Sequence, residues 1–186
     1  MALFFLDIRN FTPLIEKHPA FDVIQIVKKL FSAFQNIIRI NHGKIIETTG
    51  DGFYAAFGFH GNVKEAVNAA VQSGLAILKI LDRLNARSLE KSLSQRIDVG
   101  IGVHVGSVAT GNLHLGAKDH FVIMGYPVNV ASRLQTATKE LNNNFIVSAD
   151  VVNVLRDPLL EGESRTIHLK GVAEPLGVHL IGRTYA

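Results

Sequence analysis

The stretch Ile97-Asp98-Val99-Gly100-Ile101-Gly102-Val103-His104-Val105 alternates apolar side chains with polar residues and glycine along its whole length. Strict alternation of this kind is typical of a β-strand that buries one of its faces. Gly106-Ser107 follows as a turn signal and leads into a second stretch over residues 108–112. The pattern therefore places a sheet strand and a turn at the centre of the fold.

Elements on either side of this strand mix helices with further strands. An Asp-Gly step within Thr49-Gly50-Asp51-Gly52 predicts a hairpin, and hairpins outnumber crossover units. The sequence predicts an α+β fold, with a largely antiparallel sheet and helices over one face. The predicted strands are Leu3–Leu6, Lys44–Thr48, Phe53–Phe57, Thr166–Leu169 and Val178–Ile181; the predicted helices are Asp22–Asn41, Val63–Leu84 and one beginning at Pro127; Asn85–Gln95 is expected to be a surface loop.

Length and composition predict one soluble domain with a sizeable core. The chain has 186 residues, 47% of them hydrophobic and 19% charged, and no cysteine. Disulfides, a thiolate nucleophile and a cysteine zinc site are thereby excluded, and a reducing, cytoplasmic setting is favoured. Without a signal peptide or an apolar run of about 18 residues, no membrane contact by this segment is expected. The abrupt apolar start suggests a domain excised from a longer regulated protein, which could itself be attached to a membrane. The net charge of +3 suits an anionic small ligand as well as nucleic acid.

Two aspartates are candidates for a metal site. Asp7 ends the first predicted strand, and Asp51 lies at the tip of the predicted hairpin. If these strands are neighbours in the sheet, both carboxylates point into one pocket. Such a pair suits Mg²⁺, which takes oxygen ligands and leaves positions free for phosphates. The alternative is that Asp7 caps a turn and that Asp51 serves only the turn conformation.

Two further segments are candidates for binding phosphate. Asn10-Phe11-Thr12 follows Asp7 and could present backbone N–H groups at a helix start, which favours an anion. Asn129 and Arg133 are four residues apart and share one face of a helix. An amide beside a planar guanidinium can hold phosphate or ribose oxygens. Taken alone, the latter pair would fit a solvated polar face better than a binding site.

Taken together, these segments resemble the catalytic domain of class III nucleotidyl cyclases, the adenylate/guanylate cyclase family. The resemblance extends over nearly the whole chain and rests on several motifs in the family's order. These are the Phe-x-Asp-Ile-x-x-Phe-Thr element at residues 5–12, Gly50-Asp51, the Val-Asn-x-Ala-Ser-Arg element at residues 128–133, Leu169-Lys170-Gly171, and the stretch from Gly102 to Asn112, which is similar to the family's central hairpin.

The resemblance implies a ferredoxin-like palm that forms a 3′,5′-cyclic nucleotide and pyrophosphate from a purine nucleoside triphosphate. It also implies two Mg²⁺ or Mn²⁺ ions per site, and a head-to-tail homodimer in which the metal aspartates come from one chain and the remaining groups from the other. The implied positions are Asp7, Ile8 and Asp51 for metal, Asn129 and Arg133 for catalysis, and Asn10, Phe11, Thr12, Glu47, Val122 and Lys170 for substrate.

In the family, base choice depends on the two positions held here by Glu47 and Val122. A carboxylate at the first position can accept from N1–H and N2–H of guanine, whereas it would face the acceptor N1 of adenine. Glu47 therefore favours GTP, while Val122 can neither accept from adenine nor donate to guanine. The alternative for Glu47 is an exposed strand residue without a base contact.

Two other functions remain open. The combination of Glu47, Val122 and Tyr126, which stands where the family often has Asp, is compatible with a weak or inactive cyclase-homology module that binds nucleotide or dimerises to regulate an attached domain. A nucleic-acid-binding ferredoxin-like domain would need exposed aromatic residues on its central strands. The central strand offers valine and glycine instead, so no nucleic-acid partner is expected.

Overall fold

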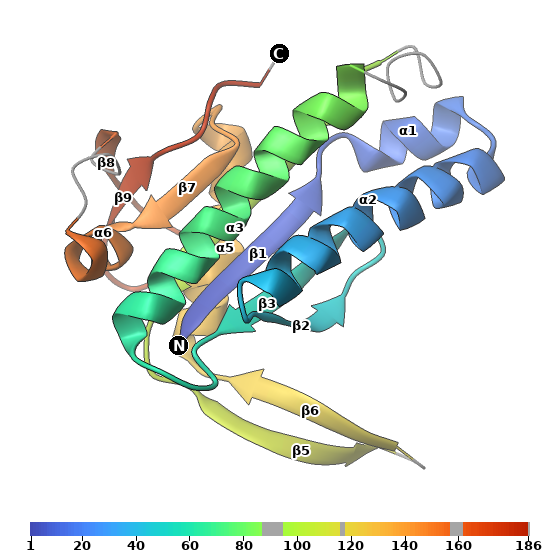
Figure 1. The fold of residues 1–186 in the computed structure, drawn as a ribbon. Helices are drawn as coiled ribbons and strands as arrows, with labels where there is room; N and C mark the ends of the chain where they lie inside the picture. The colour runs from blue at the N-terminus through green and yellow to red at the C-terminus, as the bar shows by residue number, and fades with distance from the viewer. Residues whose placement is uncertain (87–94, 116–117, 157–161, 186) are drawn as a thin grey trace.

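The computed structural model describes residues 1–86, 95–115, 118–156 and 162–185. Within these ranges, seven strands form the main sheet in the order β2-β3-β1-β4-β7-β9-β8 (Figure 1). Every neighbouring pair is antiparallel except β4 and β7. The predicted α+β fold with a largely antiparallel sheet is therefore confirmed. The strands are β1 (Ala2–Ile8), β2 (Lys44–Thr48), β3 (Gly52–Phe57), β4 (Val99–Val105), β7 (Phe145–Ser148), β8 (Glu163–Ile167) and β9 (Leu176–Leu180).

Helices cover both faces of this sheet, and not one face as expected. The helices α2 (Ala20–Ile40), α3 (Val63–Leu84) and α6 (Ala149–Leu155) pack on one face, while α5 (Tyr126–Glu140) packs on the other. Glycine in β4 explains the second layer: a Cβ on Gly102 would lie 2.3 Å from the backbone nitrogen of Gln135. The face of β4 that carries the polar residues and glycines of the alternating sequence is the face on which α5 packs.

Two clusters of buried side chains pack on the two faces of β1. The larger lies between the sheet and α2 and α3, and it includes Phe4, Phe34 and Phe53. The smaller lies on the α5 face, where Leu3 and Ile123 are buried and Phe5 packs against them. Since successive residues of β1 point to opposite faces, Asp7 shares the α5 face with Leu3 and Phe5.

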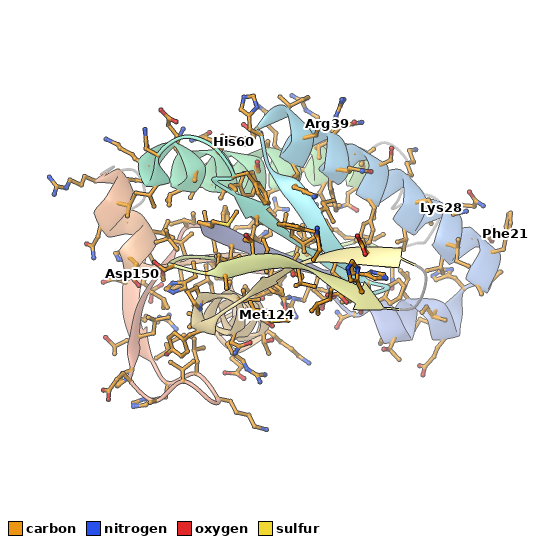
Figure 2. All side chains as sticks on the ribbon, turned by 90° about the horizontal axis from the view of Figure 1, so that it is seen from below. Phe21, Lys28, Arg39, His60, Met124 and Asp150 are labelled. Carbon is orange, nitrogen blue, oxygen red and sulfur yellow. The ribbon has the colours of Figure 1, made fainter. Side chains whose placement is uncertain are left out.

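A second sheet corrects the expected arrangement after β4. The strands β5 (Ala109–Leu115) and β6 (Lys118–Met124) pair with each other, with Ala109 opposite Met124. The chain turns at Gly106-Ser107 as predicted, but β5 does not continue as the partner of β4. This hairpin extends away from the main sheet (Figure 1), and in Figure 2 Met124 lies near the centre of the view, away from Phe21 and Lys28 on α2.

Several boundaries also differ from those predicted. The first strand continues through Asp7 to Ile8, and the short helix α1 (Phe11–Lys17) follows it. The strand β7 and the helix α6 were not anticipated, since four and seven residues carry too little periodicity to be recognised. Of the expected loop at 85–95, residues 87–94 lie outside the described residues. Its first residue, Asn85, is buried and exchanges hydrogen bonds of 2.8 and 3.0 Å with the backbone of Ile97.

In the described part of the chain, none of the helices has the length and apolar character that crossing a membrane requires.

Candidate active site

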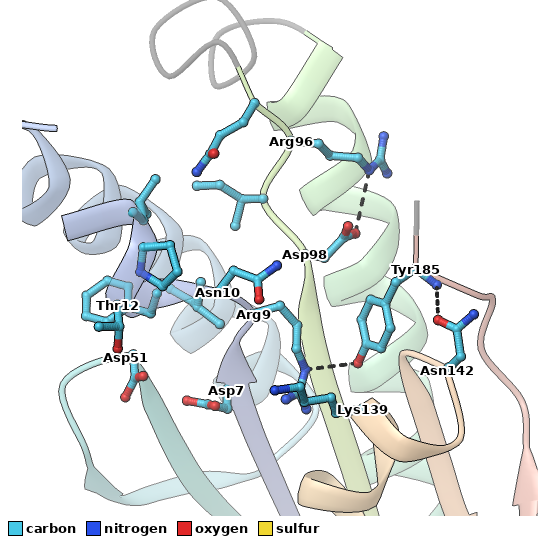
Figure 3. Close-up of a pocket in the computed structure, with 16 residues that line it drawn as sticks. Asp7, Arg9, Asn10, Thr12, Asp51, Arg96, Asp98, Lys139, Asn142 and Tyr185 are labelled. Carbon is cyan, nitrogen blue, oxygen red and sulfur yellow. Dashed lines mark hydrogen bonds and ion pairs between the residues drawn. The ribbon is translucent and has the colours of Figure 1, made fainter. Parts of the chain in front are cut away.

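Asp7 and Asp51 line one cavity of about 610 Å³ at the end of β1 (Figure 3). The strand register brings them together, because Asp7 lies opposite Gly52 on the neighbouring strand β3. A side chain on Gly52 would not fit, since its Cβ would lie 2.6 Å from the carbonyl oxygen of Leu6 and 2.9 Å from Oδ1 of Asp7. The backbone N–H of Ile8 donates a 2.9 Å hydrogen bond to the carbonyl oxygen of Asp51, which holds the hairpin tip against β1.

The two carboxyl groups form a centre of concentrated negative charge. Burial and the neighbouring charge of Asp51 raise the pKa of Asp7 to about 6, and Arg9 offsets part of this effect. A bound cation would relieve the repulsion. Mg²⁺ is commonly held by one or two carboxylates together with substrate phosphates, so this oxygen donor set fits it. The described residues contain no group of three or more His, Cys, Asp or Glu placed to hold a metal without such help.

The beginning of α1 lines the same cavity with Asn10, Phe11 and Thr12. Asn10 adopts a left-handed conformation with φ of 54°, and its carbonyl oxygen accepts a 3.1 Å hydrogen bond from the N–H of Leu14. The first N–H groups of a helix have no partner within the helix. The N–H groups of Phe11 and Thr12 therefore have no partner within α1, whose first residues line the cavity together with the two aspartates.

Arg9 and Tyr185 are cavity residues that the sequence did not single out. Arg9 Nε donates a 3.1 Å hydrogen bond to the hydroxyl of Tyr185 (Figure 3). Arg9 Nη2 donates a 3.0 Å hydrogen bond to the carbonyl oxygen of Gln135. Arg9 Nη2 also donates a hydrogen bond to the hydroxyl of Thr138. The available signal was a cation two positions after Asp7, but its partner Tyr185 is 176 residues away in the chain.

Asn129, Arg133 and Lys170 lie elsewhere on the surface of the chain. Asn129 and Arg133 are exposed on α5, and Lys170 is exposed between β8 and β9. None of the three lines the cavity that holds Asp7, whereas Lys139 on the last turn of α5 does. At 1.5 Å per residue, Arg133 lies about 9 Å and Asn129 about 15 Å from Lys139 along the helix. A single chain does not bring both groups of predicted residues together.

Glu47 and Val122 also lie outside that cavity. Glu47 is exposed on β2, directly opposite Tyr54 on β3. Val122 is half-buried on β6, and the backbone of the next residue, Ile123, lies near enough to the hydroxyl of Tyr54 to influence its pKa. The two expected base positions are thus linked through Tyr54.

Comparison with known proteins identifies the family. Residues 1–182 match the model of the "Adenylate and Guanylate cyclase catalytic domain". An adenylate cyclase of Anabaena cylindrica is 28% identical over 182 residues, which are 96% of this chain and 36% of that protein. The chain thus spans about a third of the length of that curated relative.

Solved structures agree in fold. The adenylyl cyclase CyaB from P. aeruginosa superposes with a TM-score of 0.85 at 24% identity, covering 96% of this chain and 91% of that one. The guanylyl cyclase Cya2 superposes with a TM-score of 0.87 at 22% identity, covering 99% and 92%. Because the family model matches residues 1–182 of the 186 residues, this chain belongs to the adenylate and guanylate cyclase catalytic domain family.

Proposed function

We propose that this domain converts a purine nucleoside triphosphate, GTP in preference to ATP, into its 3′,5′-cyclic monophosphate and pyrophosphate. The observation that carries the proposal is the Asp7–Asp51 pair in a cavity that α1 also lines. Carboxylates for a cation beside backbone N–H groups for phosphate oxygens suit a triphosphate with its metal ions.

Each group in this cavity has a distinct task. Asp7 and Asp51, with Ile8 beside them, would hold two Mg²⁺ or Mn²⁺ ions. Bound there, the ions would supply charge neutralisation for the phosphates and a more acidic ribose 3′-hydroxyl. The N–H groups of Phe11 and Thr12, next to Asn10, would hold phosphate oxygens in place.

The remaining groups would come from a second copy of the chain. Arg133 would stabilise charge that develops at the α-phosphate, Asn129 would orient the ribose, and Lys170 would hold the terminal phosphates. The separation of these residues from Asp7 within one chain supports a shared site. Because every chain carries both groups, a twofold homodimer would contain two equivalent sites.

GTP is favoured by Glu47, whose carboxylate can accept from N1–H and N2–H of guanine. The exposure of Glu47 on β2 supports this role, because its carboxylate is accessible to a bound base. The proteins similar to this chain are named both adenylyl and guanylyl cyclases, so their names do not favour either base.

Incubation of the purified chain with Mn²⁺ or Mg²⁺ and either GTP or ATP tests the proposal, with cyclic product separated by chromatography. We expect cyclic GMP to form faster than cyclic AMP, and Asp51→Asn to form neither. Nucleotide binding without product from either triphosphate, over a wide range of protein concentration, would favour the inactive regulatory module instead.

A further inference from the structure

Tyr54 occupies a central place on the sheet face that carries Asp7. Its ring stacks on Phe5 of β1, with 4.9 Å between ring centroids and 8° between ring planes. Glu47 lies directly opposite Tyr54 across the β2–β3 ladder. Residues paired in this way point to the same face with their Cβ atoms about 5 Å apart. The Phe5 stack therefore fixes a phenol next to the carboxylate expected to read the base.

The hydroxyl of Tyr54 is a neutral donor. Burial and the charge of Glu47 raise the pKa of Tyr54, so the phenol keeps its proton at neutral pH. The backbone of Ile123 partly offsets this rise, which indicates that its N–H lies on the side of the phenol oxygen. The O–H can rotate to donate to another acceptor.

The second expected base position, Val122, offers no hydrogen-bond donor. Val122 immediately precedes Ile123 and has an aliphatic side chain that neither donates nor accepts. A guanine whose N1–H and N2–H meet Glu47 presents its acceptor O6 next to that pair. To bind O6, the site therefore requires a hydrogen-bond donor beside the carboxylate of Glu47.

We propose that Tyr54 is a specificity-determining residue whose hydroxyl donates to O6 of guanine while Glu47 accepts from N1–H and N2–H. This inference rests on the proposed function, because it assigns a residue to the base site of the same reaction. Tyr54 thus takes the place of a polar side chain at position 122. Adenine fits the pair less completely, since it offers only the N6 amino group and N1 along this edge.

Tyr54→Phe tests the assignment, because it removes the hydroxyl and keeps the ring that stacks on Phe5. We expect KM for GTP to rise roughly threefold to tenfold, as for the loss of one hydrogen bond. Both kcat and KM for ATP should be unchanged. Inosine triphosphate retains O6, so its KM should rise by the same factor. Tyr126→Phe is the matched control, since Tyr126 is 56% exposed, and its KM for GTP should equal that of the wild type.

A substrate analogue tests the same contact without any mutation. In 6-thio-GTP the O6 acceptor is replaced by sulfur, a weaker acceptor, while N1–H and N2–H remain. The wild type should show a higher KM for 6-thio-GTP than for GTP, and Tyr54→Phe should show the same KM for both.

Different results separate failure of this assignment from failure of the proposed function. The role of Tyr54 alone is overturned if the wild type forms cyclic product but two KM values do not differ as expected. In that case KM for GTP is the same in the wild type and in Tyr54→Phe, and the wild type has the same KM for GTP and for 6-thio-GTP. A rise in KM for ATP and not for GTP overturns the contact with O6. A wild type that forms no cyclic product overturns the proposed function, and the assignment of Tyr54 with it.

Discussion

The carboxyl group of Asp7 lies beside that of Asp51 in a half-buried position at the ends of β1 and the β2–β3 hairpin. Burial and this neighbouring charge together raise the pKa of Asp7 to about 6, compared with 3.8 for a free aspartate. The folded domain therefore holds a proton at Asp7 more tightly than the unfolded chain does.

Without divalent cations, this pair should make the free energy of unfolding fall as the pH rises from about 4 to about 6. In that window the native state binds more protons than the unfolded state, so the slope is negative. Asp7→Asn should remove the slope and be more stable than the wild type at pH 7.5. Urea denaturation in EDTA at several pH values measures this. A wild-type curve parallel to that of Asp7→Asn would contradict the assigned interaction.

Cations should change the same pH profile. Because a metal ligand must be deprotonated, Mg²⁺ competes with the proton for Asp7. We expect added Mg²⁺ to raise the melting temperature more at pH 7.5 than at pH 5. Asp7→Asn should show a much smaller shift at both values. An equal shift in the wild type at both values would indicate that the ion binds elsewhere.

The contact between β4 and α5 predicts a position where the smallest added side chain destabilises the fold. A Cβ on Gly102 would lie 2.3 Å from the nitrogen of Gln135 and 2.7 Å from the carbonyl oxygen of Ala131. Both are backbone atoms, so the helix must move, and Gly102→Ala should cost about 1–3 kcal/mol. Gly111→Ala is the control, because nothing lies within 4 Å of its Cβ, and it should change stability by less than about 0.5 kcal/mol. Chemical denaturation compares the two.

Local sequence patterns predicted those parts of the molecule that depend on local structure. The alternation in β4, the Asp-Gly hairpin and the helix Val63–Leu84 were all recognisable. The joint position of Asp7 and Asp51 followed from one further condition, the pairing of β1 with β3. Contacts between distant segments were not predictable. The packing of α5 against the glycines of β4 involves a helix about 30 residues further along the chain. The hydrogen bond from Arg9 to Tyr185 joins residues near the two ends of the sequence.

Substitution of both expected base-reading residues should change nucleotide preference. In Glu47→Lys with Val122→Asp, the ammonium can donate to N1 of adenine and the carboxylate can accept from its amino group. We expect the ratio of kcat/KM for GTP to that for ATP to fall at least tenfold, since each misplaced hydrogen bond costs about 1 kcal/mol. A wild type that uses ATP alone would show that Glu47 does not read the base.

Mixing of two inactive variants tests whether the site is shared between chains. Asp51→Ala lacks one proposed metal ligand, and Arg133→Ala lacks the proposed phosphate contact. Both should fold, because Asp51 is only half-buried and Arg133 is exposed, and each should be inactive alone. In a heterodimer of the two, one site lacks both groups, while the other combines an intact Asp51 with an intact Arg133.

Activity should therefore return on mixing, to at most about a quarter of the wild-type value when chains exchange at random. Half of the dimers are then heterodimers, each with one intact site out of two. Activity of the wild type should also rise faster than linearly with protein concentration as dimers form. A mixture of Asp51→Ala with Asp7→Ala is the control, since both lesions fall in the same group and no intact site can arise. If subunit exchange is demonstrated and the first mixture stays as inactive as the control, Asp51 and Arg133 must act within one chain.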